Sequence, residues 1–175
     1  MIMKIGFGFD THQLVEGRPL LIGGILIDHY KGSLGHSDGD VLIHAICDAL
    51  LGAMGLADIG THFPDNDPSL KGIDSKILLQ KVVKLVKSEG YSIANIDTTV
   101  VLQTPKMITY VGQIKSCLSE ILSIKESQIA IKAKTSENIG FIGREEGVSA
   151  YAVVLLEQIR IMRGKKQMGN QPIKF

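Results

Sequence analysis

The sequence predicts an α/β (α+β) sandwich, in which helices pack on one face of a mixed β-sheet. Two observations predict it. Segments with strand character alternate with segments of helical periodicity along the 175 residues, as in folds that layer helices on a sheet. The length suffices for one hydrophobic core, and no charged or Pro/Ser-rich run divides the chain. We therefore expect a single domain over 1–162, followed by a flexible basic tail over 163–175, where periodicity is lost.

Up to residue 72 the pattern predicts two strands and one helix. Residues 2–12 and 20–29 are apolar runs that turn residues separate, and we expect both to be strands. Residues 38–54 are apolar almost all round, which is typical of a buried helix. Residues 55–72 contain two prolines and several acids and predict an irregular loop. A loop of this length inside a compact domain is usually functional or disordered.

Beyond residue 72, helices and strands alternate. Asp74 or Ser75 can cap a helix that Gly90 ends. The next expected elements are a strand over 91–102, a helix over 107–122 and a strand over 128–135. The last element, 148–162, is apolar enough to be of either type. We expect a strand there, because the turn over 143–147 would let it form a hairpin with the preceding strand.

Bulk properties exclude several classes of protein. The formal net charge of +1 leaves no basic face for nucleic acid. No segment approaches the roughly 20 apolar residues of a membrane span. Cys47 and Cys117 lie in apolar, helix-like stretches without metal-type spacing, so both are expected to be reduced. We therefore expect a cytoplasmic protein that binds neither nucleic acid nor membrane.

Asp10, His12 and His44 predict a metal site. Asp10 and His12 are two apart in an extended strand and so point to one face, while His44 interrupts an apolar helix. A catalytic zinc takes three such ligands and leaves its fourth position open. Asp40 competes with Asp10 for the carboxylate position, because it shares a helix face with His44. We prefer Asp10, and expect Asp40 and Asp48 to orient an imidazole.

An anion site is expected beside this metal site. His36, Ser37 and Asp38 directly precede the helix, where free backbone N–H groups favour an anion. Asp38 can cap the helix while His36 and Ser37 face a phosphate. Two later segments that follow strands, 103–107 and 134–137, are turns or binding loops, and Glu137 could hold a second, harder cation.

Five motifs together resemble the 2-C-methyl-D-erythritol 2,4-cyclodiphosphate synthase family. The resemblance covers about residues 4 to 160, in order and with family-like spacing. The motifs are Ile5-Gly6-x-Gly8-Phe9-Asp10-x-His12, His36-Ser37-Asp38-Gly39-Asp40-x-x-x-His44, Asp58-Ile59-Gly60 with Phe63-Pro64-Asp65-x-Asp67-Pro68, Pro105-Lys106-Met107, and Gly140-Phe141-x-Gly143-Arg144-x-Glu146-Gly147.

The resemblance implies an enzyme of the non-mevalonate route to isoprenoids. In this reaction the 2-phosphate of 4-diphosphocytidyl-2-C-methyl-D-erythritol 2-phosphate attacks the β-phosphate and expels CMP, which leaves a cyclic diphosphate. The resemblance also implies a homotrimer around a central channel, with active sites between subunits. Asp10, His12 and His44 would bind one zinc ion per subunit, and Glu137 would ligate Mg²⁺ or Mn²⁺ bridging the diphosphate.

The resemblance assigns further residues to three regions. Catalytic roles fall on His36, Ser37, Lys106, Thr135 and Glu137. The methylerythritol part would be surrounded by Asp58, Ile59, Gly60, Phe63, Pro64, Asp65, Asn66 and Asp67. The cytidine and α-phosphate side would be formed by Leu102, Gln103, Thr104, Pro105, Lys106, Met107, Ile108, Lys134 and Thr135. Phe141 and Arg144 would approach the channel, where the family can hold an isoprenoid diphosphate.

Two residues depart from the family pattern, and two other functions remain as alternatives. Relatives often carry threonine where this chain has Lys134, and commonly alanine where it has Thr104. One alternative is a zinc phosphohydrolase that uses the same ligands to activate water. The other is a trimeric binding or sensor protein with a structural zinc, although structural sites are usually closed and rich in cysteine.

Overall fold

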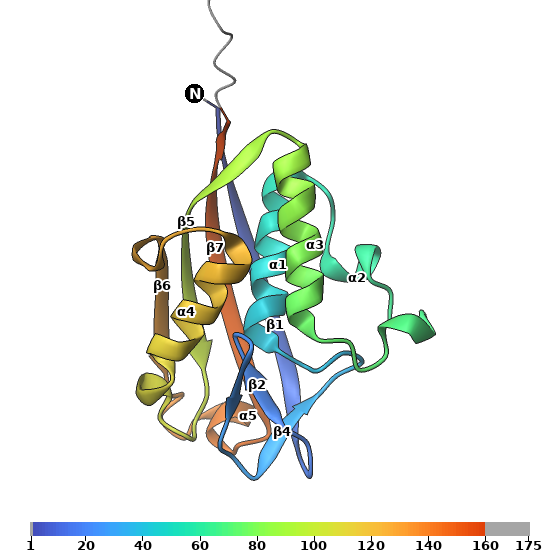
Figure 1. The fold of residues 1–175 in the computed structure, drawn as a ribbon. Coiled ribbons are helices and arrows are strands. Elements are labelled where there is room, and N and C mark those ends of the chain that lie inside the picture. Colours follow the sequence, from blue (N-terminus) through green and yellow to red (C-terminus); the bar gives the residue numbers. More distant parts are fainter. Residues whose placement is uncertain (1, 160–175) are drawn as a thin grey trace, which may run out of the picture.

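The computed structural model, which describes residues 2–159, is a five-stranded mixed sheet with its main helices packed on one face (Figure 1). The order across the sheet is β4-β1-β7-β5-β6, with β5 and β6 parallel and the other neighbours antiparallel. The strands are β1 (Met3–Glu16), β4 (Lys31–Leu34), β5 (Tyr91–Val101), β6 (Ile129–Lys134) and β7 (Gly147–Gln158). The predicted fold class is confirmed. The predicted tail over 163–175, and the ends of the predicted domain and last element at residue 162, lie outside the described residues.

Three long helices form the second layer. They are α1 (Val41–Met54), α3 (Ser75–Ser88) and α4 (Val111–Leu122). Most of α1 is buried, because the sheet lies on one side of it and α3 on another (Figure 1). This explains why its sequence is apolar almost all round. By contrast, α3 and α4 bury one apolar side each and expose a polar one.

Strand β1 approaches α1 unusually closely, because it places glycines toward the helix. A Cβ built on Gly6 would lie 1.8 Å from the backbone oxygen of Ala49, and one on Gly8 would lie 2.0 Å from that of Ala45. No larger residue fits at either position unless the backbone moves. The alternation of β1 then continues along the same face to Asp10 and His12.

On the opposite face of the sheet, no helix of the described residues covers the strands, and the part formed by β1 and β7 is largely apolar. Ile5, Phe7 and Phe9 alternate with the glycines of β1 and are exposed, as are Tyr151 and Val153 on the neighbouring strand β7. The rings of Phe9 and Tyr151 pack together with their centroids 5.0 Å apart. We call these five residues the open sheet face.

The predicted strand over 20–29 is wrong in its details. It is a hairpin of β2 (Leu20–Ile22) and β3 (Ile25–Ile27), and it forms a separate two-stranded sheet. Gly23 and Gly24 both have positive φ and make the two-residue turn, which is the conformation that such glycine pairs favour. The sequence analysis also missed β4, a short strand with little apolar alternation.

The last strand is confirmed as a strand, but its predicted hairpin with the preceding strand is wrong. β7 lies between β1 and β5, in the centre of the sheet. The short helix α5 (Gly140–Gly143) precedes it. Ala150, Ala152 and Val154 are fully buried there, and such a row of small apolar residues suits a central strand under a helix.

Several boundaries differ from the predictions. The predicted loop over 55–72 contains the short helix α2 (Ile59–His62) and a 3₁₀ turn over Pro68–Leu70. Further 3₁₀ turns cover Met107–Thr109, just before α4, and Glu126–Gln128, just before β6. Asp40, rather than Asp38, is the cap of α1.

Candidate metal centre and neighbouring cavities

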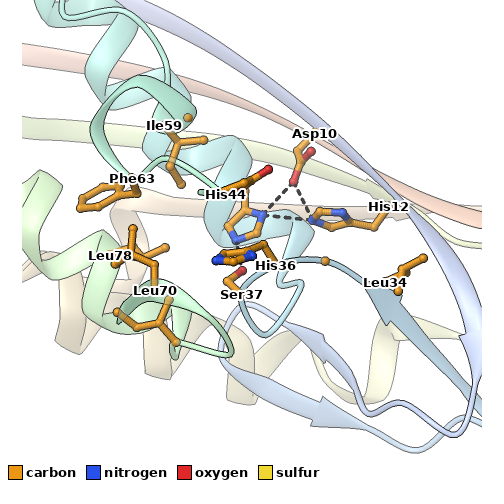
Figure 2. Close-up of a pocket in the computed structure, with 14 residues that line it drawn as sticks. Asp10, His12, Leu34, His36, Ser37, His44, Ile59, Phe63, Leu70 and Leu78 are labelled. Atoms are coloured by element: carbon orange, nitrogen blue, oxygen red, sulfur yellow. Dashed lines mark hydrogen bonds and ion pairs between the residues drawn. The ribbon is translucent and has the colours of Figure 1, made fainter. Parts of the chain in front are cut away.

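The three predicted ligands lie together just beyond Gly6 and Gly8, where β1 faces the first turns of α1. Asp10 Oδ2 lies 3.0 Å from His12 Nε2 and 2.9 Å from His44 Nδ1. The two ring nitrogens are 3.1 Å apart. Figure 2 shows the three side chains pointing at one another. Their ligand atoms all lie within 4.8 Å of one another, so they form a group that could hold a metal ion.

The charges of this group suit a cation. Burial works against the charged form of Asp10, but the hydrogen bonds from His12 and His44 outweigh it and hold the pKa of Asp10 well below its usual range. Burial likewise opposes protonation of His44, and the hydrogen bond and charge of Asp10 outweigh it, which raises the pKa of His44. The protonated His44 ring thus supplies positive charge beside the Asp10 carboxylate. A divalent ion would take the place of that charge, since ligands must be deprotonated to bind a metal.

Asp40 is not a competing ligand, and the expected role of Asp40 and Asp48 in orienting an imidazole is wrong. Asp40 Oδ1 accepts hydrogen bonds from the N–H groups of Leu42 and Ile43, at 3.1 and 3.0 Å. The same carboxylate accepts from Gly23 at 2.9 Å and from Gly24 at 2.6 Å, so it fastens the β2–β3 turn to α1.

Asp48 has a similar structural use. Its Oδ1 accepts a hydrogen bond of 2.7 Å from the N–H of Ile59, which fixes the start of α2 against α1. Burial raises the pKa of Asp48, and this hydrogen bond opposes the shift. Of the three polar residues spaced four apart along α1, His44 therefore belongs to the candidate metal site, whereas Asp40 and Asp48 accept hydrogen bonds that anchor the backbone of neighbouring segments.

The contacts of the second nitrogen of His44 were missed by sequence reasoning. His44 Nε2 lies 2.9 Å from Ser75 Oγ and 3.1 Å from Ser37 Oγ. Ser75 Oγ in turn donates to Asp38 Oδ1, at 2.5 Å. The sequence indicated only a possible helix cap at Ser75, because nothing local to residue 75 points to a histidine 31 positions earlier.

A cavity of about 360 Å³ opens onto the ligand group. Of the residues predicted around the phosphate and the methylerythritol part, His36, Ser37, Ile59, Gly60, Phe63 and Asp65 line it. Apolar side chains complete the wall, among them Leu34, Leu70 and Leu78 (Figure 2). The cavity therefore combines a candidate cation site, polar groups and apolar wall residues.

Four predicted residues do not line this cavity. Pro64 and Asn66 belong to the loop between α2 and the following 3₁₀ turn. Asp58 accepts from the N–H and hydroxyl of Thr61 and caps α2, and Asp67 accepts from the N–H of Ser69 and caps the 3₁₀ turn. Hydrogen bonds from the side chain and the N–H of Thr61 lower the pKa of Asp58, and those from the side chain and the N–H of Ser69 lower the pKa of Asp67.

A second cavity of about 340 Å³ lies at the ends of β5 and β6. Its lining includes the predicted residues Leu102, Pro105, Lys106, Met107, Ile108, Lys134, Thr135 and Glu137. It shares no residue with the first cavity. Thr135 Oγ1 donates a short hydrogen bond to Glu137 Oε1, which orients that carboxylate.

Two residues predicted for the cytidine side are not part of its lining. The Gln103 side chain pairs with Asn138 through two hydrogen bonds, at 3.0 and 3.3 Å. Thr104 Oγ1 lies 3.3 Å from His29 Nε2. Both residues therefore hold the loop after β5 in place through hydrogen bonds to residues outside the cavity lining. Phe141 and Arg144 line neither cavity, and Arg144 forms an exposed ion pair with Glu146 at 2.9 Å.

Comparisons with known proteins all match this chain to one protein family. The sequence profile of the YgbB family matches residues 3–157. The chain is 57% identical over 159 residues to the 2-C-methyl-D-erythritol 2,4-cyclodiphosphate synthase of Bacteroides fragilis, which covers 91% of this chain and 100% of that protein. Among residues 2–159, no helix is both long and apolar enough to cross a lipid bilayer.

Solved structures show the same fold. IspF of Plasmodium falciparum, in complex with CDP, matches with a TM-score of 0.80 and 37% identity, over 90% of this chain and 97% of that one. The bifunctional IspDF of Campylobacter jejuni matches with a TM-score of 0.87 and 40% identity. The match covers 90% of this chain and 43% of the longer bifunctional protein.

Proposed function

The chain belongs to the YgbB family of 2-C-methyl-D-erythritol 2,4-cyclodiphosphate synthases, and we propose that its two cavities receive opposite ends of the substrate of that enzyme. The enzyme is a lyase of the non-mevalonate route to isoprenoids. It converts 4-diphosphocytidyl-2-C-methyl-D-erythritol 2-phosphate into the 2,4-cyclodiphosphate and CMP. The observation that carries the proposal is that three ligand atoms converge at the mouth of a cavity lined by family motifs.

We propose zinc as the ion held by Asp10, His12 and His44, one per subunit. One carboxylate and two imidazoles form a ligand set of the catalytic zinc type. When bound, the ion would supply positive charge that neutralises a phosphate oxygen. His36 and Ser37, beside it in the cavity, would bind and orient the same phosphate. Positioning of this kind accounts for much of the acceleration in phosphoryl transfer, because the protein performs little covalent chemistry.

In the first cavity the methylerythritol part would lie between α2 and the metal site. Ile59, Gly60 and Phe63 offer a small apolar surface, and Asp65 offers an acceptor for a hydroxyl group. Asp58, Pro64, Asn66 and Asp67 are proposed to border this part from the loop, with Asp58 a further acceptor. With the substrate bound, a cleft between subunits would limit the access of water to the reacting groups and so limit hydrolysis.

In the second cavity we propose the cytidine and its phosphates. The loop from Leu102 to Ile108 would enclose the base, and Lys106, Lys134 and Thr135 would contact phosphate oxygens. Glu137 is the proposed ligand of a Mg²⁺ or Mn²⁺ ion that bridges the diphosphate. Carboxylates paired with phosphate oxygens are the ligands that Mg²⁺ prefers. Gln103 and Thr104 would act by bracing the loop.

We propose that a homotrimer completes the active site and that the open sheet face lines its centre. Two facts support this arrangement: the two cavities of one chain share no lining residue, and five apolar side chains lie exposed on adjacent strands. Each site would then combine the metal centre of one subunit with the nucleotide cavity of the next. Phe141 and Arg144 would face the central channel, where an isoprenoid diphosphate is the proposed ligand.

A cytoplasmic location completes the proposal. Cys47 and Cys117 are both free thiols, which suits a reducing compartment.

The decisive experiment is phosphorus NMR of the turnover mixture together with a zinc assay. We expect a cyclic diphosphate plus CMP from the wild type, and loss of both zinc and turnover in His44→Ala. His62→Ala is the matched control, since this exposed histidine lines neither cavity and its side chain hydrogen-bonds to the carbonyl of Leu56. A linear phosphate product would favour a zinc phosphohydrolase, and full activity of His44→Ala would refute the metal assignment.

A further inference from the structure

Ser75, the first residue of α3, lies at the centre of a buried group of hydrogen bonds. Ser75 is fully buried, and its hydroxyl has two partners, Asp38 Oδ1 at 2.5 Å and His44 Nε2 at 2.9 Å. Asp38 also accepts from the N–H of Ser75 at 2.9 Å and from the N–H of Asp40 at 3.2 Å. The carboxylate is thus surrounded by donors and acts as an acceptor throughout.

A serine hydroxyl has one hydrogen to donate. Because the Asp38 carboxylate accepts, the Ser75 hydrogen is committed to Asp38, and Ser75 Oγ can only accept from His44. His44 Nε2 must therefore carry a hydrogen. In the charged ring Nδ1 also carries a hydrogen, which Asp10 Oδ2 accepts at 2.9 Å. In the neutral ring Nδ1 is unprotonated, and its lone pair faces His12 Nε2, which lies 3.1 Å away and can donate to it. That is the form of histidine that binds a metal.

We infer that Asp38 and Ser75 are positioning residues that fix the tautomer and orientation of His44, so that Nδ1 is ready for the metal. The inference rests on the proposed function only for the identity of the ion. Groups that hold the far nitrogen of a metal-bound histidine commonly matter for affinity, and their removal costs roughly ten- to hundredfold in metal binding. Here the holding group is a carboxylate that acts through a serine.

The hydrogen bonds around His44 also determine where the hydroxyl hydrogen of Ser37 can point. Ser37 Oγ lies 3.1 Å from His44 Nε2 and accepts from the N–H of Gly39 at 3.3 Å. Since Nε2 is already a donor, Ser37 cannot donate to it. Its hydrogen remains free to point into the cavity that Ser37 lines, where an anion would accept it.

Asp38→Asn is the most informative variant, because it reverses the chain of donors. The amide oxygen replaces only one of the two carboxylate oxygens. Where it keeps the N–H of Ser75, the NH₂ group takes the place of Oδ1 and faces both Ser75 Oγ and the N–H of Asp40. Ser75 would then donate its hydrogen to His44 Nε2 and push the ring hydrogen onto Nδ1, where it blocks the metal. We expect zinc affinity to fall roughly ten- to hundredfold. Ser75→Ala removes the acceptor and should lower affinity in the same range.

Two matched controls separate this role from simple stability. Asp74→Asn makes the same chemical change one residue earlier than Ser75, at a side chain that binds the N–H and ammonium group of Lys76. Ser33→Ala removes a buried hydroxyl that has no partner among the described residues. Both controls should bind zinc as the wild type does. The free energy of unfolding of all four variants shows how much of any change is structural.

The test measures zinc affinity by chelator competition and the His44 tautomer by ¹⁵N NMR. The spectra are recorded on the metal-free protein at a pH high enough for a neutral ring. We expect Nε2–H in the wild type and Nδ1–H in Asp38→Asn. The inference is overturned if the wild type shows Nδ1–H, or if Asp38→Asn and Ser75→Ala bind zinc like the controls. A wild type that binds no zinc would instead refute the proposed function, since the tautomer is read without metal.

Discussion

At the scale of single residues, similar carboxylates have different uses according to what surrounds them. Asp10 faces two imidazoles, and its ionised form is favoured. Asp40 is fully buried, which raises its pKa, and hydrogen bonds from the backbone N–H groups of Ile43, Gly24 and Gly23 oppose that shift. Sequence spacing alone left these two as competitors for the metal. The structure separates them by the donors that each one meets.

Asp40→Ala should cost more stability than the loss of an ordinary helix cap. It would leave four N–H groups without their acceptor, three of them in buried hydrogen bonds, so we expect a loss of roughly 2–4 kcal/mol in the free energy of unfolding. Asp74→Ala removes the partly exposed cap of α3 and should cost about 1 kcal/mol. Urea denaturation compares the two. Equal losses would contradict the role given to Asp40 as an anchor for the β2–β3 turn.

The metal-free protein should lose stability as the pH rises through the raised pKa of His44, which lies above 6.5. The pKa of His44 is raised above its ordinary value of 6.5, so its contribution is full below pH 6.5 and is lost as the pH rises through the raised value. Zinc replaces the proton, so the stabilisation by zinc should grow over the same range. Thermal unfolding with zinc and with chelator, at several pH values from 6 to 9, measures both trends. A constant difference between the two curves would refute this prediction.

At the scale of elements, the metal centre depends on how closely α1 lies against β1. The two glycines of β1 allow backbone to touch backbone, and the ligands of β1 lie directly beyond them on the same face. The distance between Asp10 and His44 is therefore set by main-chain contact, which is stiffer than contact between flexible side chains. Helix α3 adds the second constraint through Ser75.

Gly8→Ala should destabilise the fold and weaken metal binding together. The new Cβ would lie 2.0 Å from the backbone oxygen of Ala45, so α1 must move away, and overpacking of this kind costs roughly 1–3 kcal/mol or more. Gly112→Ala, in α4, is the control because nothing lies within 4 Å of its Cβ. It should be neutral or slightly stabilising. Urea denaturation and zinc titration give the two readouts, and a Gly8→Ala protein that matches the control in both would contradict the close approach.

At the scale of the whole molecule, one sheet has two different faces. One is buried under helices, while the other exposes aromatic and aliphatic side chains in adjacent rows. Exposed apolar patches of this kind typically mark interaction surfaces. Assembly through this face would place the nucleotide cavity of one subunit beside the metal centre of another.

Phe7→Glu should prevent assembly. Three glutamates at the centre of a trimer would repel one another and lose their hydration, so we expect monomers in analytical ultracentrifugation and turnover reduced at least tenfold. Ile77→Glu places the same charge on an exposed position of α3 and should leave the trimer and the activity intact. A trimeric Phe7→Glu protein would show that the subunits meet elsewhere.

Local pattern predicted the main helices and singled out the three candidate metal ligands, because each of these signals lies within one element. The alternation of strand and helix patterns along the chain predicted the fold class. Asp10 and His12 follow strand alternation, and His44 interrupts an apolar helix. What local pattern could not supply was pairing between distant segments. The position of β7 beside β1, and the contact of Ser75 with His44, arise only when the layers pack.

The alternation of β1 has a consequence for how this chain can vary in evolution. Even-numbered residues from Gly6 to His12 face α1 or belong to the candidate metal site, and odd-numbered residues from Ile5 to Phe9 belong to the open sheet face. Inserting or deleting one residue would turn every following side chain of the strand to the other face of the sheet. This stretch should therefore tolerate substitutions, at most of its odd positions, far better than any change in length. Insertions and deletions among homologues are expected instead at the exposed Gly17-Arg18 turn, where an added Cβ meets nothing at Gly17.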